Sequence, residues 1–419
     1  MYPWNFIRTN TIYGVIHAAG GFTAWADKHA VYAAVSGPTG TATPSNVDDY
    51  YSPDVDSNVI ALHGVTTPTG VPCSPLPDQT PKALSGNWTS SFENIKCYDT
   101  LKVNAVLHWI EGKTHLGDHN APVPTIFGMN FQAVSVGQKL IESGVGKGGY
   151  KDAAGTPSAL LLGEIEFVDA SIGEMVSALQ AQELLESTLI IITAKHGQSP
   201  TDPNRFQKLG AGITTTPADV IASFLPPATP TPPILPDGSP ENPNTPSKTE
   251  PPNPPPPLGP TLDPIGPTQD DVSLLWLAPG ASVTDAVHAL EVNGTAIGLG
   301  QIFSGPSLAT MFNAPGVPVQ FGGTGGDPRT PDIIVQPNVG VVYTGSTKKH
   351  AEHGGFAHDD TNVMLLVSHP DFEASTVTSF VETTQVAPTI LQALGLDPSS
   401  LDAVQQEGTP VLPGLNFKP

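Results

Sequence analysis

A regular alternation of short apolar runs with segments of helical periodicity constrains the fold of this chain most strongly. Apolar and β-branched residues typical of strands dominate residues 22–26, 124–134, 188–194, 271–277, 332–337, 339–344 and 362–368. Apolar residues recur at the three- and four-residue spacing of amphipathic helices in residues 10–20, 158–187, 283–293 and 383–395. This order predicts an α/β fold, a three-layer sandwich with a mostly parallel central sheet covered by helices on both faces.

One segment interrupts the alternation. Residues 226–267 are rich in proline and contain no aromatic residue, so they cannot bury enough surface to fold. We expect a disordered insertion within one α/β domain that comprises residues 1–225 and 268–419. The alternative is a linker between two independent domains.

The charge balance limits the partners of the protein. The formal net charge is −22, which argues against binding to nucleic acid and to anionic membranes, because both require a basic surface. A small anionic substrate is still compatible with this charge, because a local site can oppose the overall field. No apolar run approaches the length of a membrane span. The sequence makes no prediction about oligomeric state.

Two cysteines and two sequons suggest an extracellular glycoprotein. Cys73 and Cys97 bracket a stretch rich in Pro and Ser, and an extracellular disulfide between them is one interpretation. The sequons begin at Asn87 and Asn293, although both can arise by chance. The first residues lack the pattern of a signal peptide. If the protein is secreted, we expect that its signal segment is not present in this chain.

Polar residues follow the apolar run 189–194 directly. Lys195, His196 and Gly197 come at its end, and ligands of open α/β sheets bind beyond the carboxyl ends of the strands. These side chains are therefore candidates for chemistry. The alternative is that Lys195 is solvated and that His196 caps the next turn.

A second polar cluster lies far downstream, before the apolar run 362–368. Its members are His and carboxylate side chains, a set that suits zinc and similar divalent ions. They are His350, Glu352, His353, His358, Asp359 and Asp360. A solvated polar loop is the alternative. Asp27 and His29, after the run 22–26, form a weaker candidate metal or substrate site.

Three segments together resemble the alkaline phosphatase superfamily, and its type I phosphodiesterase/nucleotide pyrophosphatase branch in particular. They are LIIITAKHGQSP (189–200), AEHGGFAHDDTNVMLLVS (351–368) and TTQVAPTILQALGL (383–396). The resemblance implies an alkaline-phosphatase-like sheet and one active site formed from both sides of the proline-rich insertion. It also implies a pair of zinc ions, held by Asp and His side chains, that activate a nucleophile.

The resemblance is incomplete at the residues that matter most. His196 and His353 match two family histidines and are the predicted metal ligands. Lys195 replaces the aspartate expected before His196, and an ammonium does not bind zinc. The segment VSVGQ aligns with a second family motif that contains an aspartate and a histidine. Val134 stands in place of that aspartate, and Gln138 in place of that histidine. The segment with the nucleophile would precede Tyr2.

These substitutions predict a degenerate site with at most one weakly held divalent ion, zinc first. Lys195 is the candidate catalytic residue, because a fixed ammonium can hold a phosphate as a point charge; simple decay of the site is the alternative. Gln138, His358 and Asp359 are further candidates for metal or substrate binding. We expect a phosphoric ester hydrolase-like protein for small anionic esters, weakly active or inactive as this chain. The alternatives are a non-catalytic anion-binding relative and a sulfate or phosphonate ester hydrolase.

Overall fold

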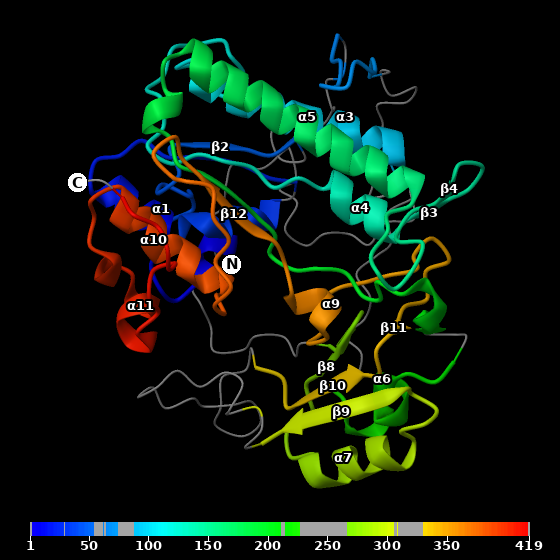
Figure 1. Ribbon diagram of the computed structural model, residues 1–419. Coiled ribbons are helices and arrows are strands. Elements are labelled where there is room, and N and C mark those ends of the chain that lie inside the picture. Colours follow the sequence, from blue (N-terminus) through cyan, green and yellow to red (C-terminus); the bar gives the residue numbers. More distant parts are fainter. Residues whose placement is uncertain are drawn as a thin grey trace, which may run out of the picture. The chain divides into compact units, whose positions relative to one another are not determined.

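The computed structural model describes residues 2–28, 30–53, 62, 64–73, 88–210, 214–226, 266–305, 308 and 330–417 (Figure 1). The chain divides into two compact units. Unit 1 comprises Met1–Gly137, Ala159–Lys195 and Val363–Pro419, and unit 2 comprises Gln138–Ser158 and His196–Asn362. The predicted insertion at 226–267 lies almost wholly outside the described residues.

Unit 1 combines long helices with short strands. Its helices are α1 (Ile12–Ala18), α3 (Phe92–Ile110), α4 (Ala133–Lys139, which ends in unit 2), α5 (Ala159–Ala181), α10 (Val386–Ala393) and α11 (Asp402–Glu407). Its strands are β1 (Ala24–Ala26), β2 (Asp49–Tyr51), β5 (Ile190–Thr193) and β12 (Leu365–Ser368). Its 3-10 helices are η1 (Pro3–Phe6), η2 (Ala30–Ser36), η3 (Leu185–Ser187), η6 (Thr383–Gln385) and η7 (Pro398–Ser400).

The main core of unit 1 lies where α3 and α5, which run side by side in Figure 1, meet β1. Trp109 and Ile110 of α3 and Leu179 of α5 pack with Ala24 and Ala26 of β1. All five side chains are buried, so this contact removes a large apolar surface from water. A second cluster joins α1 to α10.

Unit 2 is built mainly of short strands. These are β3 (Ile141–Glu142), β4 (Gly146–Lys147), β6 (Gln207–Leu209), β7 (Thr268–Gln269), β8 (Ser273–Leu275), β9 (Leu299–Ser304), β10 (Ile333–Pro337) and β11 (Val341–Tyr343). The helices are α6 (Pro217–Val220), α7 (Val283–Val292) and α9 (His358–Thr361), with 3-10 helices η4 (Pro203–Arg205) and η5 (Ala222–Phe224). Strands β7, β8, β10 and β9 form an antiparallel sheet in that order. Helix α7 lies along this sheet (Figure 1), and its Ala286 and Leu290 pack on Leu275, Ile333 and Val335.

The structure contains both helices and strands, as the sequence predicted. The described residues do not, however, form the expected mostly parallel central sheet. Their sheets are small and of mixed orientation. Strand β1 pairs in parallel with β2, whereas β12 pairs antiparallel with β5. Strand β5, expected to be buried, is only partly buried. Apolar periodicity identifies a strand but carries no information about its neighbour, so it could not establish whether the strands pair in parallel.

The run 124–134 is the clearest error in the predicted elements. It makes only isolated parallel bridges to the chain at β1, and helix α4 then begins at Ala133. The backbone N–H groups of Gln132 and Ala133 donate to Asp99 Oδ2 of α3, at 2.7 and 2.8 Å. A carboxylate at a helix N-terminus satisfies otherwise unpaired donors. This stabilising group comes from elsewhere in the chain, so the local pattern does not show it.

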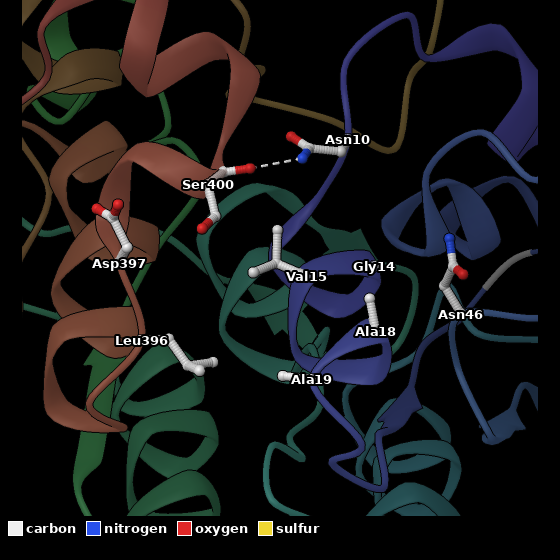
Figure 2. A pocket seen from close by; sticks show the side chains of 9 residues that line it. All are labelled: Asn10, Gly14, Val15, Ala18, Ala19, Asn46, Leu396, Asp397 and Ser400. Atoms are coloured by element: carbon white, nitrogen blue, oxygen red, sulfur yellow. Dashed lines mark hydrogen bonds between the residues drawn. The ribbon is translucent and has the colours of Figure 1, made fainter.

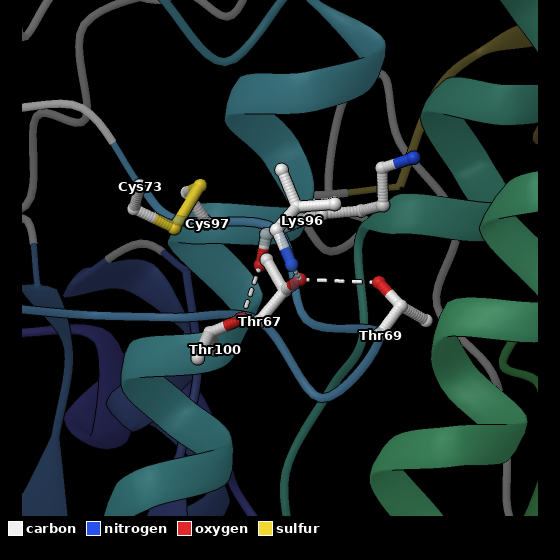
Figure 3. The surroundings of a disulfide bond; sticks show 7 residues. Thr67, Thr69, Cys73, Lys96, Cys97 and Thr100 are labelled. Carbon is white, nitrogen blue, oxygen red and sulfur yellow. Dashed lines mark hydrogen bonds between the residues drawn. A yellow bond between two sulfur atoms is a disulfide. The ribbon is translucent and has the colours of Figure 1, made fainter.

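A disulfide joins Cys73 to Cys97 in the first half of α3 (Figure 3), with the sulfur atoms 2.09 Å apart. The pairing that was one interpretation of the sequence is therefore present. In the next turn of the helix, Thr100 Oγ1 donates to the carbonyl of Lys96 (2.8 Å). Among the described residues, no helix combines the length and apolarity needed to cross a membrane.

Candidate functional site

The structure brings His196 and His353 together, although 157 positions separate them in the chain. Their rings are stacked, with centroids 4.0 Å apart and planes inclined by 8°. Both residues belong to unit 2, and each lies in a loop rather than in a helix or strand. The predicted proximity of the two imidazoles is thus observed, whereas their predicted role as metal ligands stays a prediction.

Backbone hydrogen bonds hold the two segments in place. Ser199 and Glu352 exchange N–H to carbonyl bonds of 2.8 and 2.9 Å. The N–H of Gly197 donates to the carbonyl of Asp360 at 2.6 Å. A side chain at position 197 would meet the carbonyl oxygen of Asp359 at 2.0 Å, so only glycine allows this approach. The Gly after His196 is therefore a packing requirement of the site.

An oxygen atom lies near Nδ1 of each ring. His196 Nδ1 lies 2.7 Å from the carbonyl oxygen of Gly197. Since a carbonyl only accepts, Nδ1 carries the proton in this arrangement. His353 Nδ1 faces Glu352 Oε2 at 3.6 Å. Histidines that bind metals commonly have this arrangement, with Nδ1 directed at an oxygen and Nε2 at the metal.

The ring planes, however, do not fit a shared metal ion. Zinc binds a histidine nitrogen at about 2.0–2.1 Å along the lone pair, which lies in the ring plane. The lone pairs of two stacked rings lie in separate, nearly parallel planes, so they do not converge on one ion. Among the described residues, no group of three or more His, Cys, Asp or Glu side chains is arranged to hold a metal.

Glu352 supplies a buried negative charge beside this pair. Its side chain is fully buried, and Lys349 Nζ contacts its Oε1. Burial raises the pKa of Glu352, but His353 and Lys349 outweigh burial and hold the pKa below its ordinary value. The carboxylate is therefore charged at neutral pH.

Lys195 belongs to unit 1, and its environment differs from that of His196 and His353. It is exposed, and its Nζ donates to the Tyr32 hydroxyl at 2.8 Å. The same nitrogen lies 4.2 Å from the centroid of the Tyr32 ring, a cation–π contact. Both contacts restrain the ammonium while leaving it accessible to solvent. Its predicted action on a phosphate is untested.

Asp27 was a candidate ligand, but protein donors already occupy its carboxylate. Its side chain is buried. Oδ1 accepts from the Lys28 N–H (2.8 Å) and from Asn130 Nδ2 (3.1 Å), and Oδ2 accepts from Trp25 Nε1 (3.0 Å). These bonds hold Asp27 beside β1, and its role in metal or substrate binding stays a prediction. His29 lies outside the described residues.

The remaining candidates are dispersed in unit 2. Gln138 Nε2 donates to the Tyr150 hydroxyl at 2.8 Å. His358 is exposed at the first position of α9. Asp359 Oδ2 accepts from the Thr201 N–H at 2.7 Å. Their roles in metal or substrate binding stay predictions.

His350, from the same downstream cluster, is buried rather than exposed at a site. Burial lowers its pKa to about 4, with a smaller contribution from Lys147, so the ring is neutral at pH 7. Phe206 packs edge-on against the ring, with centroids 6.4 Å apart. The dense cluster of His residues therefore includes at least one core histidine.

Sequence reasoning missed Asp271, which lies opposite Asp360 in unit 2. Both side chains are buried, and they are within hydrogen-bond reach of one another. The only local signal was a pair of consecutive aspartates, 270 and 271, directly before an apolar run. Polar residues at strand ends are too common to select this pair without its partner.

Unit 1 has a shallow pocket between α1 and η7 (Figure 2). Small and apolar residues of α1 form one wall, and Asn10 Nδ2 donates to the carbonyl of Ser400 at the rim (2.7 Å). Its lining residues are Asn10, Gly14, Val15, Ala18, Ala19, Asn46, Leu396, Asp397 and Ser400. None of the residues selected from the sequence lines this pocket.

Comparison with known proteins gives structural neighbours alone. No family model and no curated protein matches the sequence. Human ectonucleotide pyrophosphatase/phosphodiesterase 5 aligns with a TM-score of 0.45 and 13% identity, over 92% of this chain and 70% of that chain. The murine protein aligns with a TM-score of 0.45 and 12% identity over the same shares, and so does its inactive variant in complex with AMP. At this TM-score and identity the likeness carries no argument, so the function is argued from the residues.

Proposed function

We propose that this chain is a phosphoric ester hydrolase-like protein of the phosphodiesterase/nucleotide pyrophosphatase type with a degenerate metal site. We expect the chain with this sequence to turn over little or no substrate. The observation that carries the proposal is the stacking of His196 on His353. The two histidines that the family resemblance selects lie together, but in an orientation unsuited to a shared ion.

The residues at other ligand positions support the degenerate state. Lys195 stands where the resemblance expects an aspartate, and its ammonium interacts with Tyr32. Gln138 stands where it expects a histidine, and its amide donates to Tyr150. Each loss removes both a metal bond and a compensating charge. We therefore propose at most one weakly held divalent ion, zinc first, on either imidazole.

The second candidate function is non-catalytic binding of a small anionic ester. The exposed Lys195 ammonium favours it, since a point charge on a restrained side chain can hold a phosphate group. The overall negative charge does not oppose such binding, because the interaction is local.

We also propose an extracellular location or the secretory pathway. The Cys73–Cys97 disulfide supports it, because disulfides persist in oxidising compartments. The sequon at Asn293 falls at the exposed C-terminal end of α7, where a glycan is sterically accessible. Asn87 lies outside the described residues.

Hydrolysis of bis-nitrophenyl phosphate with added zinc or manganese tests the catalytic part. We expect nitrophenol release close to that of buffer, unchanged in His196→Ala. The matched control is His288→Ala, which alters an exposed histidine of α7 in the same unit. Robust turnover that is lost in His196→Ala and retained in His288→Ala would overturn the proposal.

Metal analysis and phosphate titration complete the test. We expect about one zinc ion or fewer per chain after gel filtration, since a dinuclear site needs more ligands than these residues provide. Calorimetric titration with inorganic phosphate separates the two candidate functions. Phosphate binding that weakens in Lys195→Met, without turnover, would favour the binding protein.

A further inference from the structure

We propose that unit 2 contains a separate cation site, in which the carboxylates of Asp271 and Asp360 bind one hard divalent cation, Ca²⁺ in the first place. Asp271 lies two residues before β8, and Asp360 belongs to α9. The site shares no proposed ligand with the His196/His353 pair. Its test, cation binding, is therefore distinct from the test of phosphodiesterase activity.

The first observation is a pair of buried carboxylates that face one another without a donor between them. The side chains of Asp271 and Asp360 are 1% and 3% exposed. They lie within hydrogen-bond reach, yet Oδ2 of each has no hydrogen-bond partner in the described part of the chain. The other oxygen of Asp360 accepts from the Gly354 N–H at 3.2 Å. That N–H belongs to a residue with φ of +101°, a conformation that favours glycine.

Two facing carboxylates inside a protein cannot both stay charged without a positive partner. Burial raises the pKa of both groups, and the charge of Asp360 raises the pKa of Asp271 further. The charges of Glu352 and Asp270 act in the same direction on Asp271. Across the described ranges, no Lys or Arg forms an ion pair with Asp271 or Asp360, whereas Glu352 contacts Lys349. The charge of His353 acts to lower the pKa of Asp360, but burial outweighs it. The pair therefore requires a proton or a cation.

The second observation is a set of oxygen atoms on one side of Gly355. A side-chain carbon at this position would lie 2.5 Å from Asp271 Oδ2 and 3.1 Å from both the Asp271 carbonyl oxygen and Gln336 Oε1. Gln336 is fixed with its oxygen inward, because Oε1 accepts from the Phe356 N–H at 2.7 Å. Glycine thus lets the backbone approach three oxygens, one each from a carboxylate, a backbone carbonyl and an amide, which we call the oxygen niche.

This combination of oxygens is typical of calcium ligands. Ca²⁺ binds carboxylates together with backbone and amide carbonyls, and it tolerates irregular geometry. Mg²⁺ retains more of its water and suits a buried niche less well. A divalent ion neutralises both carboxylates, whereas a shared proton neutralises one. Because protons compete for the same oxygens, cation affinity should rise with pH.

Thermal unfolding with and without Ca²⁺ tests the proposal. The intact protein is treated with a chelator, and Ca²⁺ or Mg²⁺ is then added at constant ionic strength, which separates binding from screening of the negative surface. We expect Ca²⁺ to raise Tm by about 3 °C or more at saturation and Mg²⁺ to raise it less. Calorimetry with Ca²⁺ alone should give close to one site per chain.

Two substitutions locate the site. Asp360→Asn retains a hydrogen bond to Asp271 but removes a charge, so the variant should fold and lose its response to Ca²⁺. Gly355→Ala places a methyl group in the oxygen niche and should have the same effect. The control is Asp332→Asn, a buried carboxylate of unit 2 whose Oδ2 accepts from the Leu277 N–H (2.8 Å). It should respond to Ca²⁺ like the wild type.

Three outcomes would overturn the proposal. One is a wild-type Tm that no divalent cation changes, and another is an equal Ca²⁺ response in Asp360→Asn. The third combines a wild-type Tm that does not respond to Ca²⁺ with an Asp360→Asn variant that is more stable than the wild type at neutral pH. That result would mean that the two carboxylates share a proton. None of these results depends on the proposed function, whose own test is ester hydrolysis.

Discussion

Two buried carboxylates, one in each unit, have opposite environments. In unit 1, Asp99 pairs with Lys102 at 2.8 Å, and both side chains are fully buried. The other oxygen of Asp99 accepts two backbone N–H groups at the start of α4. In unit 2, Asp271 faces a second carboxylate, Asp360, and among the described residues no Lys or Arg forms an ion pair with either.

Asp99 stabilises the fold, whereas Asp271 needs a proton or a ligand to offset its buried charge. Asp99 has a charge partner and backbone donors, so its burial is compensated within the chain. Asp271 has like charges around it, and burial without compensation is costly. The burial of an acidic residue that has protein partners needs no further ligand to compensate it. A buried acidic residue without partners points to a proton or a ligand.

Breaking the compensated pair should have the largest effect. Lys102→Met removes the charge partner of Asp99, the hydrogen bond from Nζ to the Asn130 carbonyl and the cation–π contact with Tyr98. We expect a loss of about 3–5 kcal/mol in the free energy of unfolding, because an uncompensated charge stays buried. Urea denaturation measures it.

The control for this change is an exposed ion pair of the same unit. Lys113 Nζ lies 2.7 Å from Glu111 Oε2, with side chains 39% and 41% exposed. Lys113→Met should cost less than about 0.5 kcal/mol, since solvent screens the pair. Equal losses in the two variants would contradict the contrast between the buried and the exposed pair.

The next effect concerns a buried neutral group of unit 2, His350, which should lower the stability of the protein as the pH falls. Burial lowers the pKa of this ring to about 4, below its ordinary value of 6.5. Between these values the unfolded chain binds a proton that the folded chain does not, so stability is lost as pH falls from 6.5 to about 4. We expect a loss of about 2 kcal/mol from this group.

Comparison of the wild type with His350→Gln isolates that contribution. Urea denaturation at neutral pH and near pH 4.5 gives the acid-induced loss for each protein. The loss should be smaller in the variant, because carboxylates contribute equally to both. An identical loss would mean that His350 is not a buried neutral group.

The smallest effect is expected from deletion of residues 230–260 in the proline-rich insertion. Closure of a long loop costs little more than closure of a short one, so Tm should change very little. Differential scanning calorimetry of the deletion variant tests this. A large decrease in Tm would show that the insertion contributes to the stability of unit 2.

The sequence predicted local structure well and spatial neighbours poorly. The helices found at α1, α5, α7 and α10 follow their apolar spacing. Helix α3 was missed because it is buried on most of its sides and shows no single apolar stripe. The parallel central sheet was wrong for the described residues, because β12 pairs antiparallel with β5.

The candidate site shows the same division. The motifs selected His196 and His353 as neighbours, and their rings are in contact. The motifs did not show that these rings stack, that Tyr32 engages Lys195, or that Asp271 faces Asp360. Each of these contacts joins residues far apart in the chain.

By itself, the sequence determined the types of most elements, the strongly negative charge and the polar residues that follow the apolar runs. These features depend on short-range preferences and on composition, which any stretch of chain carries with it. Tertiary structure alone decided which strands pair, which histidine is buried and which carboxylate lacks a partner. Those outcomes depend on desolvation and on charges brought close by folding, and neither exists until distant segments pack together.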